Sequence, residues 1–483
     1  MKLKRFKYIQ RFVGTGVIFA TLNDTVPIYK KRRKPYIMIG WSMCSFVAFC
    51  MSTLELPLPR NSIQLCPNCS ITNFGNLTSK QCKEMFLHKI PDPHLSDKDY
   101  VVISVKYLLM LMCFITFLVM TDVALDGLMV QYARKEKIEE RGRVQTAIYS
   151  CRNLGFFVAA LIRGFGLNWY LYVGPWCHGL DMDDIFFILA ICSLVSLGLT
   201  IVFTHEDDII EMYYFKKSIF KMWNTLCKVG IQRMLCFLII SHVTQQLRSP
   251  ADSMIMSKWV HMSSLTKNLL GSCIGDIFFM IGTFMFAKYL LNRNWRITFA
   301  STEIVMVSIN IIITLNVVFI PLMRNQYLYV SDDAFSSIFG GMNYLCGLLL
   351  AIEISDEGVE GTTYGLITTI GNISQTAGAV IGNIFSFPFS VSKDFRYNRD
   401  SITDRIFVGS NITMIYTMQL INLAFISYLP TSKKHTQQLV TSSPTSLSGA
   451  VFLILVALAL FGFTLIYGFT WPFLGEYFYV ETA

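Results

Sequence analysis

Two carboxylates and one arginine are the residues of this sequence whose types and spacing best suit chemistry inside an apolar region. Asp122 and Asp126 lie four residues apart in TDVALDGLMVQYARKE, so they share one face of a helix. Their mutual repulsion favours proton binding by at least one of them. Arg152 follows in the next apolar stretch, and its planar guanidinium suits a carboxylate. We expect a proton site at the two acids, with Arg152 either paired to them or bound to an anionic substrate; the alternative is that both acids, near the end of their apolar run, are simply hydrated.

A second polar set occurs in the other half of the chain. His242, Gln245 and Gln246 fall together in SHVTQQLRSP, and such side chains can hydrogen-bond a heterocyclic ligand. The same groups can instead bond neighbouring membrane helices, and both interpretations stay open. Glu303 is a further acid within an apolar stretch, and Glu360 ends a short acidic turn ahead of a glycine-rich stretch.

No arrangement typical of an enzyme accompanies these residues. HEDD at 205–208 has no second metal-ligand group nearby, and the GxSxG, HExxH and Walker patterns do not occur. CPNC at 66–69 lacks the second Cys or His pair of a zinc site. We therefore expect no catalytic residues, no cofactor and no metal. The missing Walker loop also argues against an ATP-driven pump.

The elements that must position these side chains are segments long enough to cross a membrane. Of 483 residues, 53% are hydrophobic and 15% are charged, and the mean hydropathy is +0.47. A soluble chain is about a quarter charged, whereas a bilayer helix needs about 20 mostly apolar residues. The sequence predicts an all-α polytopic membrane protein with about 12 spans. They are expected at 12–28, 36–55, 103–120, 144–167, 185–204, 233–249, 268–287, 298–322, 333–352, 361–386, 408–429 and 449–470.

The distribution of cations predicts which loops face the cytoplasm. Five consecutive cations occupy 30–34, shortly after Asp24. Because cytoplasmic loops are enriched in Lys and Arg, this turn is expected inside, and alternation then places the loop 56–100 outside. The net charge of +9 is explained by such loops, so no nucleic-acid partner is expected. The basic N-terminus conflicts with this topology, because alternation places it outside.

The long loop 56–100 carries signals of an oxidising compartment. Asn68 and Asn76 begin the sequons NCS and NLT, which are candidates for glycosylation. Clustered cysteines outside the cytoplasm favour disulfides. The disulfide candidates are Cys66, Cys69 and Cys82 in this loop and Cys177 in the next outer loop.

The chain is expected to divide into two helical halves. Residues 1–204 form the N-terminal half, 205–232 a charged central cytoplasmic loop, and 233–430 the C-terminal half. A long central loop between two halves is typical of a duplicated transporter. A Ser/Thr-rich linker at 431–448 and an additional membrane helix at 449–470 follow.

Four stretches in this order resemble the folate–biopterin transporter family, a branch of the major facilitator superfamily. They are LNDTVPIYKKRRKPYIMIGW, DVALDGLMVQYARKE with the downstream GRVQTAIYSCRNLG, KYLLNRNWR, and EGVEGTTYGLITTIGNIS. The resemblance covers most of the chain between about residues 12 and 430. It implies two six-helix halves with alternating access around a central cavity.

The resemblance also implies roles for individual residues. Asp24, Arg32 and Arg33 match the gating turn of the superfamily, where an acid and nearby cations close the cytoplasmic face by charge pairing. The other matched residues, in the family's fourth and fifth helices and ahead of its eleventh, are Asp122, Asp126, Arg152 and Glu360. The implied function is secondary active transport of folate- or pterin-type anions, commonly with protons, and the plasma membrane is the default location.

Departures from the family pattern keep two alternatives open. We expect the family's helix ahead of 12–28 to be missing from this chain, and Lys30-Lys31 replaces the glycine usually found ahead of the two arginines. The span 449–470 lies outside the basic fold. The first alternative is a carrier of the same fold for another small organic metabolite. The second is a truncated membrane protein that does not transport.

Overall fold

The computed structural model describes residues 15–54, 97–137, 142–168, 179–206, 215–263, 265–355, 360–389 and 400–480. Within these ranges the protein is helical, and the only β-type pairings recorded are two isolated bridges. This confirms the all-α class that the sequence predicts. Each of the twelve expected spans overlaps a helix.

The N-terminal group of helices contains the candidate residues Asp24, Asp122, Asp126 and Arg152. Its elements are α1 (Thr15–Thr25), α2 (Lys34–Ser52), α4 (Asp97–Lys135), α5 (Arg143–Leu161) with the π-helical turn η3 (Ile162–Gly166), and α6 (Met182–Phe203). The predicted central loop that follows contains a short helix, α7 (Phe215–Leu226).

The C-terminal group is longer and has more broken helices. It begins with α8 (Val229–Gln245), α9 (Pro250–Met254), η5 (Ile255–Trp259), η6 (Thr266–Gly271), α10 (Ser272–Met285), η7 (Phe286–Leu290) and α11 (Trp295–Phe319). It continues with η8 (Pro321–Met323), α12 (Gln326–Ile354), α13 (Glu360–Ser386), η9 (Phe387–Phe389), α15 (Ile402–Gln419), η11 (Leu420–Tyr428), α16 (Lys433–Ser442) and α17 (Leu447–Val480).

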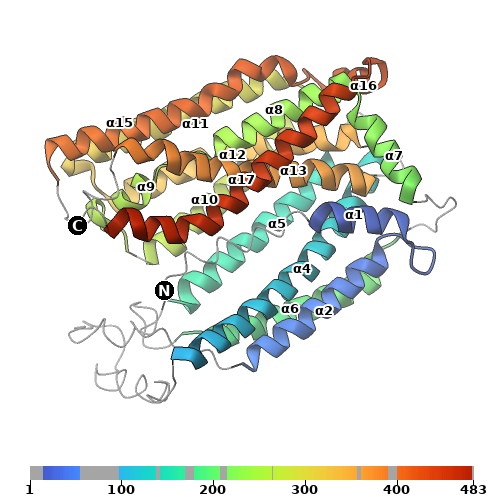
Figure 1. Ribbon diagram of the computed structural model, residues 1–483, viewed down its shortest axis with the longest axis horizontal. Coiled ribbons are helices and arrows are strands. Elements are labelled where there is room, and N and C mark those ends of the chain that lie inside the picture. Colours follow the sequence, from blue (N-terminus) through green and yellow to red (C-terminus); the bar gives the residue numbers. More distant parts are fainter. Residues whose placement is uncertain are drawn as a thin grey trace.

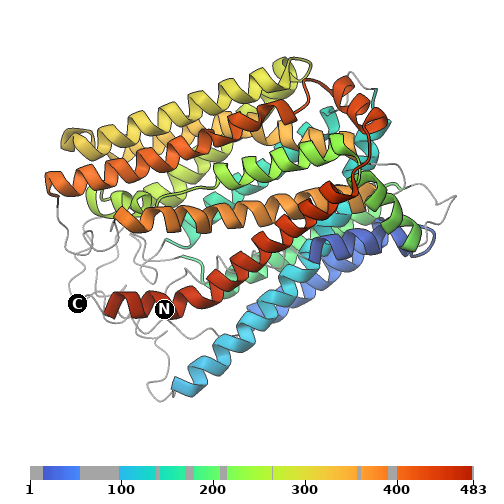
Figure 2. The ribbon, with the colours of Figure 1, turned by 45° about the horizontal axis from the view of Figure 1, so that its top comes forward.

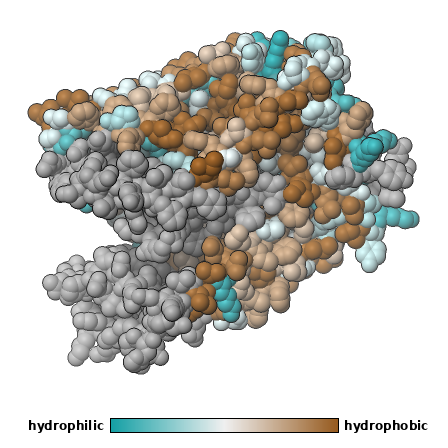
Figure 3. Space-filling model, viewed as in Figure 1, coloured by the Kyte–Doolittle hydropathy of each residue, from teal (hydrophilic) through white to brown (hydrophobic). Residues whose placement is uncertain are grey.

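Eight helical segments within the described residues are long and apolar enough to cross a membrane. The other four expected spans coincide with α1, α5, α8 and α13. The outward face of α6 exposes Leu194 and Val202, at 58% and 64%, as a surface in contact with lipid would. Hydrophobic side chains cover much of the visible side of the bundle, and hydrophilic ones gather near its ends (Figure 3).

The two groups of helices run side by side and meet at one end of the bundle. In Figure 1 this is the end at which α1 and α7 lie, and α2 and α4 diverge from α15 and α17 towards the opposite end. Contacts between the groups join α13 to α1 and α4, and α10 to α5. The helix α13 therefore lies at the centre of the junction.

Small residues bring α13 and α8 into close contact. A Cβ atom added at Gly378 would lie 2.2 Å from the carbonyl oxygen of Val243. Only glycine allows two backbones to approach this closely, which is a common way of packing helices in membranes. The glycine-rich stretch singled out in the sequence thus fixes the position of α8, which carries His242 and Gln245.

The last two helices pack onto the C-terminal group. Within the predicted linker 431–448, α16 begins after Ser432, whose side chain accepts a hydrogen bond from the backbone of His435. Thr436 of this helix is fully buried. The final helix α17 crosses in front of the other helices in Figure 2 and contacts α8 and α13.

Candidate functional site

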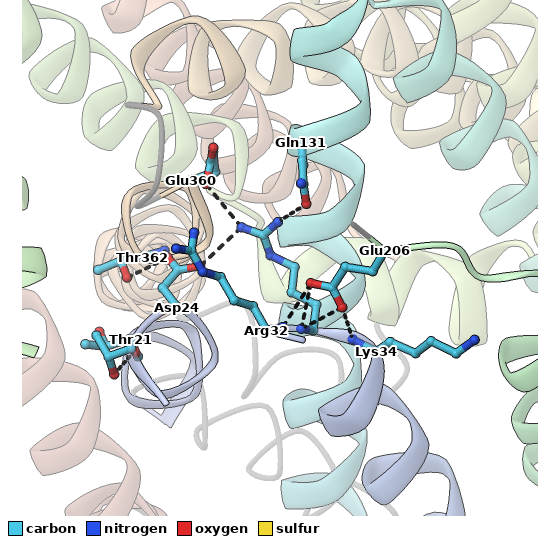
Figure 4. A network of polar contacts seen from close by, with 10 residues as sticks. Thr21, Asp24, Arg32, Lys34, Gln131, Glu206, Glu360 and Thr362 are labelled. Carbon is cyan, nitrogen blue, oxygen red and sulfur yellow. Dashed lines mark hydrogen bonds and ion pairs between the residues drawn. The ribbon is translucent and has the colours of Figure 1, made fainter. Parts of the chain in front are cut away.

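Arg33 is the centre of a buried polar cluster at the junction of the two groups, here called the gate cluster. One Nη atom lies 3.2 Å from a carboxylate oxygen of Asp24 and 3.2 Å from one of Glu360. The other donates to Gln131 Oε1 at 2.5 Å. In Figure 4 dashed lines join Asp24, Gln131 and Glu360 to one guanidinium, which by these hydrogen bonds is that of Arg33. Because Asp24 is on α1 and Glu360 begins α13, the guanidinium bridges the two groups.

The second oxygen of Asp24 binds the start of α13 directly. It accepts hydrogen bonds from the backbone N–H of Thr362 at 2.6 Å and from the Thr362 hydroxyl at 2.8 Å. A carboxylate near the first turn of a helix also interacts favourably with the helix dipole. Asp24 and Arg33 are 1% and 2% exposed. The cluster is thus a dry, hydrogen-bonded ion network.

Two glycines make room for this network. A Cβ atom at Gly127 of α4 would lie 2.8 Å from Nε of Arg33, and one at Gly361 would lie 2.9 Å from Oδ1 of Asp24. Any larger residue would push the charged groups apart. The sequence places both glycines beside candidate acids, but their role depends on a contact that only the fold creates.

Glu206 organises the basic turn from outside the cluster. Its carboxylate accepts from the backbone N–H groups of Arg32, Arg33 and Lys34 at distances of 2.8 to 3.1 Å. The Lys34 ammonium in turn donates to the carbonyls of Thr204 and Ile201 at the end of α6. The turn that begins α2 is therefore tied to the segment after α6. Of the three residues expected in the gating turn, Asp24 and Arg33 form an ion pair with each other, and the backbone N–H of Arg32 donates to Glu206.

The Arg152 cluster lies deeper along α4 and α5. Arg152 pairs with Asp122, and the same Nη atom lies 3.7 Å from Asp126. The side chains of Arg152, Asp122 and Asp126 are 32%, 50% and 15% exposed, so this ion pair is less buried than the gate cluster. All three predicted residues therefore come together, with both acids from α4 and the arginine from α5.

Tyrosines from both groups surround this pair. The guanidinium of Arg152 lies 5.2 Å from the ring centre of Tyr149, within the range of a cation–π contact. The Tyr149 ring meets Tyr344 of α12 edge to face at 5.6 Å. The hydroxyls of Tyr149 and Tyr364 are 2.9 Å apart. These tyrosines cannot be recognised from the sequence alone, because a single Tyr in an apolar helix usually belongs to the core.

The helices α4 and α13 connect the two clusters. On α4, Gln131 of the gate cluster follows Asp126 by five residues, which is about 7.5 Å along a helix axis. On α13, Glu360 and Thr362 belong to the gate cluster, and Tyr364 contacts Tyr149. The two clusters are therefore separated by only one or two helical turns on α4 and on α13.

The polar set of α8 is arranged for contacts with neighbouring helices. His242 donates from Nδ1 to the Leu238 carbonyl at 2.7 Å and lies next to Gly371 of α13. Gln245 donates to Glu303 of α11 at 3.1 Å. Gln246 follows the last residue of α8 and is half-buried. The structure thus does not bring these three residues to the Arg152 cluster.

Several candidate residues lie outside the described residues. They are the glycosylation candidates Asn68 and Asn76 and the disulfide candidates Cys66, Cys69, Cys82 and Cys177. Among the residues that the structure describes, no group of three or more His, Cys, Asp or Glu side chains is arranged to hold a metal ion.

Comparison with known proteins identifies similar sequences. The sequence model of the BT1 family matches residues 94–439. A curated relative from Synechocystis, named folate-biopterin transporter, is 20% identical over 285 residues, which cover 56% of this chain and 54% of the relative. The alignment thus spans about half the length of this relative.

Comparison with solved structures finds helical transporters. One is FucP, a major facilitator superfamily transporter in an outward conformation, with a TM-score of 0.44 and 11% identity over 87% of this chain and 91% of FucP. Another is a bacterial homologue of the human lysosomal transporter Spinster, in an inward-facing and unoccupied conformation, with a TM-score of 0.41 and 11% identity over 95% of this chain and 94% of the homologue. At these identities the likeness concerns the fold alone.

Proposed function

The chain belongs to the BT1 family of membrane transporters, and we propose that it is a secondary active carrier of folate- or pterin-type organic anions, coupled to protons. The observation that carries this proposal is the Arg152 cluster. It combines a partly exposed cation, two carboxylates and aromatic rings at a place where the two groups of helices face each other. The curated relative is named for the same substrates, which supports the proposal.

The substrate is recognised by exchange of ion-pair partners. A carboxylate of an incoming folate-type anion competes with Asp122 for Arg152, because the guanidinium fork binds either partner in the same geometry. The rings of Tyr149 and Tyr344 offer aromatic surfaces against which a pterin ring can pack. Arg152 is then paired with the carboxylate of the substrate and no longer with Asp122.

The same exchange of ion-pair partners couples proton binding to substrate binding. When the substrate takes Arg152, Asp122 and Asp126 lose their cation and remain as two nearby carboxylates. Binding of a proton by either acid removes their repulsion, so substrate and proton bind together. The two acids are thus the proposed proton site, and Arg152 couples it to the substrate.

The gate cluster supports alternating access. With the cation-rich turns facing the cytoplasm, the Arg33 network closes the cytoplasmic end in the conformation described here. Opening that end requires separation of Glu360 and Thr362 from Arg33 and Asp24. Because Tyr364 lies on the same turn region of α13, occupation of the Arg152 cluster can bias this separation.

Uptake of labelled folate and biopterin tests the proposal, in cells that lack their own transporter for these compounds. We expect saturable uptake that collapses when a protonophore removes the proton gradient. Arg152→Ala should abolish it, and Arg152→Lys should retain only a small part, because lysine keeps the charge and loses the planar fork. Arg163→Ala is the matched control, because Arg163 is an exposed arginine of the turn that continues α5. Surface biotinylation measures arrival at the plasma membrane, which is part of this proposal.

The outcomes separate the alternatives. Full uptake by Arg152→Ala at equal surface expression would overturn the assigned role of Arg152. Competition of a different organic anion, with no effect of folate or biopterin, would indicate a carrier for another metabolite. Absence of any uptake, with normal surface expression, would favour a protein that does not transport.

A further inference from the structure

Glu303 occupies a setting that neither the gate cluster nor the Arg152 cluster explains. It lies in α11 and is fully buried, with an exposed fraction of 0%. Its carboxylate accepts from Nε2 of Gln245 at 3.1 Å, from Nδ2 of Asn343 at 2.7 Å and from Nδ2 of Asn422 at 3.1 Å. Four segments, α8, α11, α12 and η11, thus converge on one carboxyl group.

The hydrogen-bond partners of this carboxyl are three neutral amides, and no cation contacts it among the described residues. Titratable and charged side chains of the elements packed around it have other partners or lie further along their helices. Among them are His242 and Arg233 on α8, Arg248 just after α8, Arg296 on α11, Asp332, Asp333, Tyr344 and Glu353 on α12, Tyr428 on η11 and Tyr416 on α15. Arg296, for example, donates to the carbonyls of Leu429 and Ser427. An anion buried without a counter-ion costs several kcal/mol, and inside a membrane such a group usually has a function.

The amide of Asn422 can satisfy both protonation states of Glu303. In the arrangement described, its Nδ2 donates to the carboxylate, and its Oδ1 is buried without a hydrogen-bond partner. Rotation of the amide by half a turn would place Oδ1 where Nδ2 lies. The oxygen would then accept the O–H of a neutral carboxylic acid, which is a donor. The site is therefore built for an acid that gains and loses a proton.

Gln245 is the member of the cluster that connects Glu303 to the surroundings. Asn343 and Asn422 are 5% and 0% exposed, whereas Gln245 is half-buried and is the last residue of α8. Movement of the end of α8 away from α11 would withdraw the Gln245 amide and let water reach the carboxyl. Because α8 packs tightly on α13 through Gly378, we expect such a movement to accompany a displacement of α13 from the gate cluster.

We propose that Glu303 is a second proton-binding site, separate from Asp122 and Asp126, which exchanges its proton when α8 and α13 move. On binding, a hydronium ion gives its proton to Oε1 and becomes water, and the Asn422 amide rotates so that its oxygen accepts a hydrogen bond from the new O–H. On release the proton returns to water and the amide rotates back, and no other bond changes. The part of Glu303 in a transport cycle rests on the proposed function, whereas proton binding itself does not.

Infrared difference spectroscopy of the purified full-length protein in lipid nanodiscs, without substrate, tests the proposal. The carbonyl stretch of a protonated carboxylic acid is recorded while the pH is raised from mildly acidic to mildly alkaline. We expect one band that disappears on raising the pH and that is absent from Glu303→Gln. Asp122→Asn is the matched control and should retain this band. Asn422→Leu removes the proposed acceptor and should shift the band to higher frequency, because the acid then lacks its partner.

Three results would overturn the proposal. The band could be missing at every pH in the wild type, which would mean that Glu303 stays ionised. It could persist at every pH, which would mean that the proton is never exchanged. It could be removed by sodium at constant pH, which would mean that the site binds a metal cation. If the titrating band is present and no folate or biopterin is taken up, the proposed substrate fails while the proton site stands.

Discussion

Arg33 and Arg152 are each held by two carboxylates, yet their surroundings differ in two ways. Arg33 is 2% exposed, and its acids come from α1 and α13, which belong to opposite groups of helices. The side chain of Arg152 is 32% exposed, and both of its acids come from α4, in its own group. Arginine–carboxylate pairs therefore join the two groups of helices at Arg33 and do not join them at Arg152.

This difference determines what each arginine can do. A buried ion network between groups stabilises one relative position of the groups, and loss of one partner leaves uncompensated charge. A water-exposed pair within one group contributes little to stability, so its partner can be exchanged for a ligand at small cost. Two features thus distinguish an ion pair that holds two groups of helices together from one that can bind a ligand. They are the burial of the arginine and the group of helices that supplies its acids.

The largest expected effect is the loss of stability on removal of Arg33. Arg33→Ala leaves Asp24 and Glu360 buried without their shared cation, so we expect a loss of about 3–5 kcal/mol in the free energy of unfolding. The thermal midpoint of the purified protein, measured by tryptophan fluorescence, should fall by many degrees.

The control for this substitution is Lys34→Ala, which removes a neighbouring cation whose ammonium binds only backbone carbonyls. It should lower the thermal midpoint much less. If Arg33→Ala and Lys34→Ala unfolded at the same temperature, the buried network would not stabilise the junction, and the contrast with Arg152 would lose its basis.

The sequence predicted the helices well because long apolar segments dictate membrane spans with little help from tertiary contacts. All twelve expected spans overlap a helix, and the resemblance to the folate–biopterin transporters is confirmed by the family match. Asp122, Asp126 and Arg152 were found together because they lie on two consecutive helices. Their roles in binding stay predictions.

The parts of the site that the sequence did not reveal depend on contacts between distant residues. Glu206 lies in a motif that suggested at most a metal ligand, yet it binds the backbone of a turn more than 170 residues away. Nothing in the sequence distinguishes Gln131, Thr362 and Tyr364 from other helical residues. Their contacts depend on the packing of α4 and α13. The grouping of Gln245 with Glu303 likewise requires knowledge of how α8 and α11 pack.

A smaller effect on stability is expected at the exposed pair. Asp122→Asn removes one acid beside Arg152, and exposed ion pairs contribute about 0.2–1 kcal/mol, so the thermal midpoint should change by a few degrees at most. Uptake at varied pH should change strongly, because a proposed proton acceptor is lost. A fall in the midpoint as large as that of Arg33→Ala would show that both clusters serve mainly to hold the bundle together.

The smallest expected effect concerns the backbone of the gating turn. Tyr29 and Lys30 have φ values of 50° and 60°, in the left-handed region that glycine adopts most readily. The turn is closed by hydrogen bonds between Ile28 and Lys31, and it lies between Asp24 and Arg33 along the chain. Lys30→Gly relieves a steric cost of roughly 1–2 kcal/mol and adds about 0.5–1 kcal/mol of entropy cost, for a net gain of about 0.5 kcal/mol.

Differential scanning calorimetry compares the unfolding temperatures of Lys30→Gly and Lys30→Ala. Because both variants lose the same ammonium, the difference between them does not include the effect of the charge. The glycine variant should unfold at the higher temperature of the two. Because the turn supports the gate cluster and not the Arg152 cluster, the added stability should vanish in an Arg33→Ala background and persist in an Asp122→Asn background. Equal gains in both backgrounds would mean that the turn and the buried network are energetically independent, and that closure of this end depends on the ion network alone.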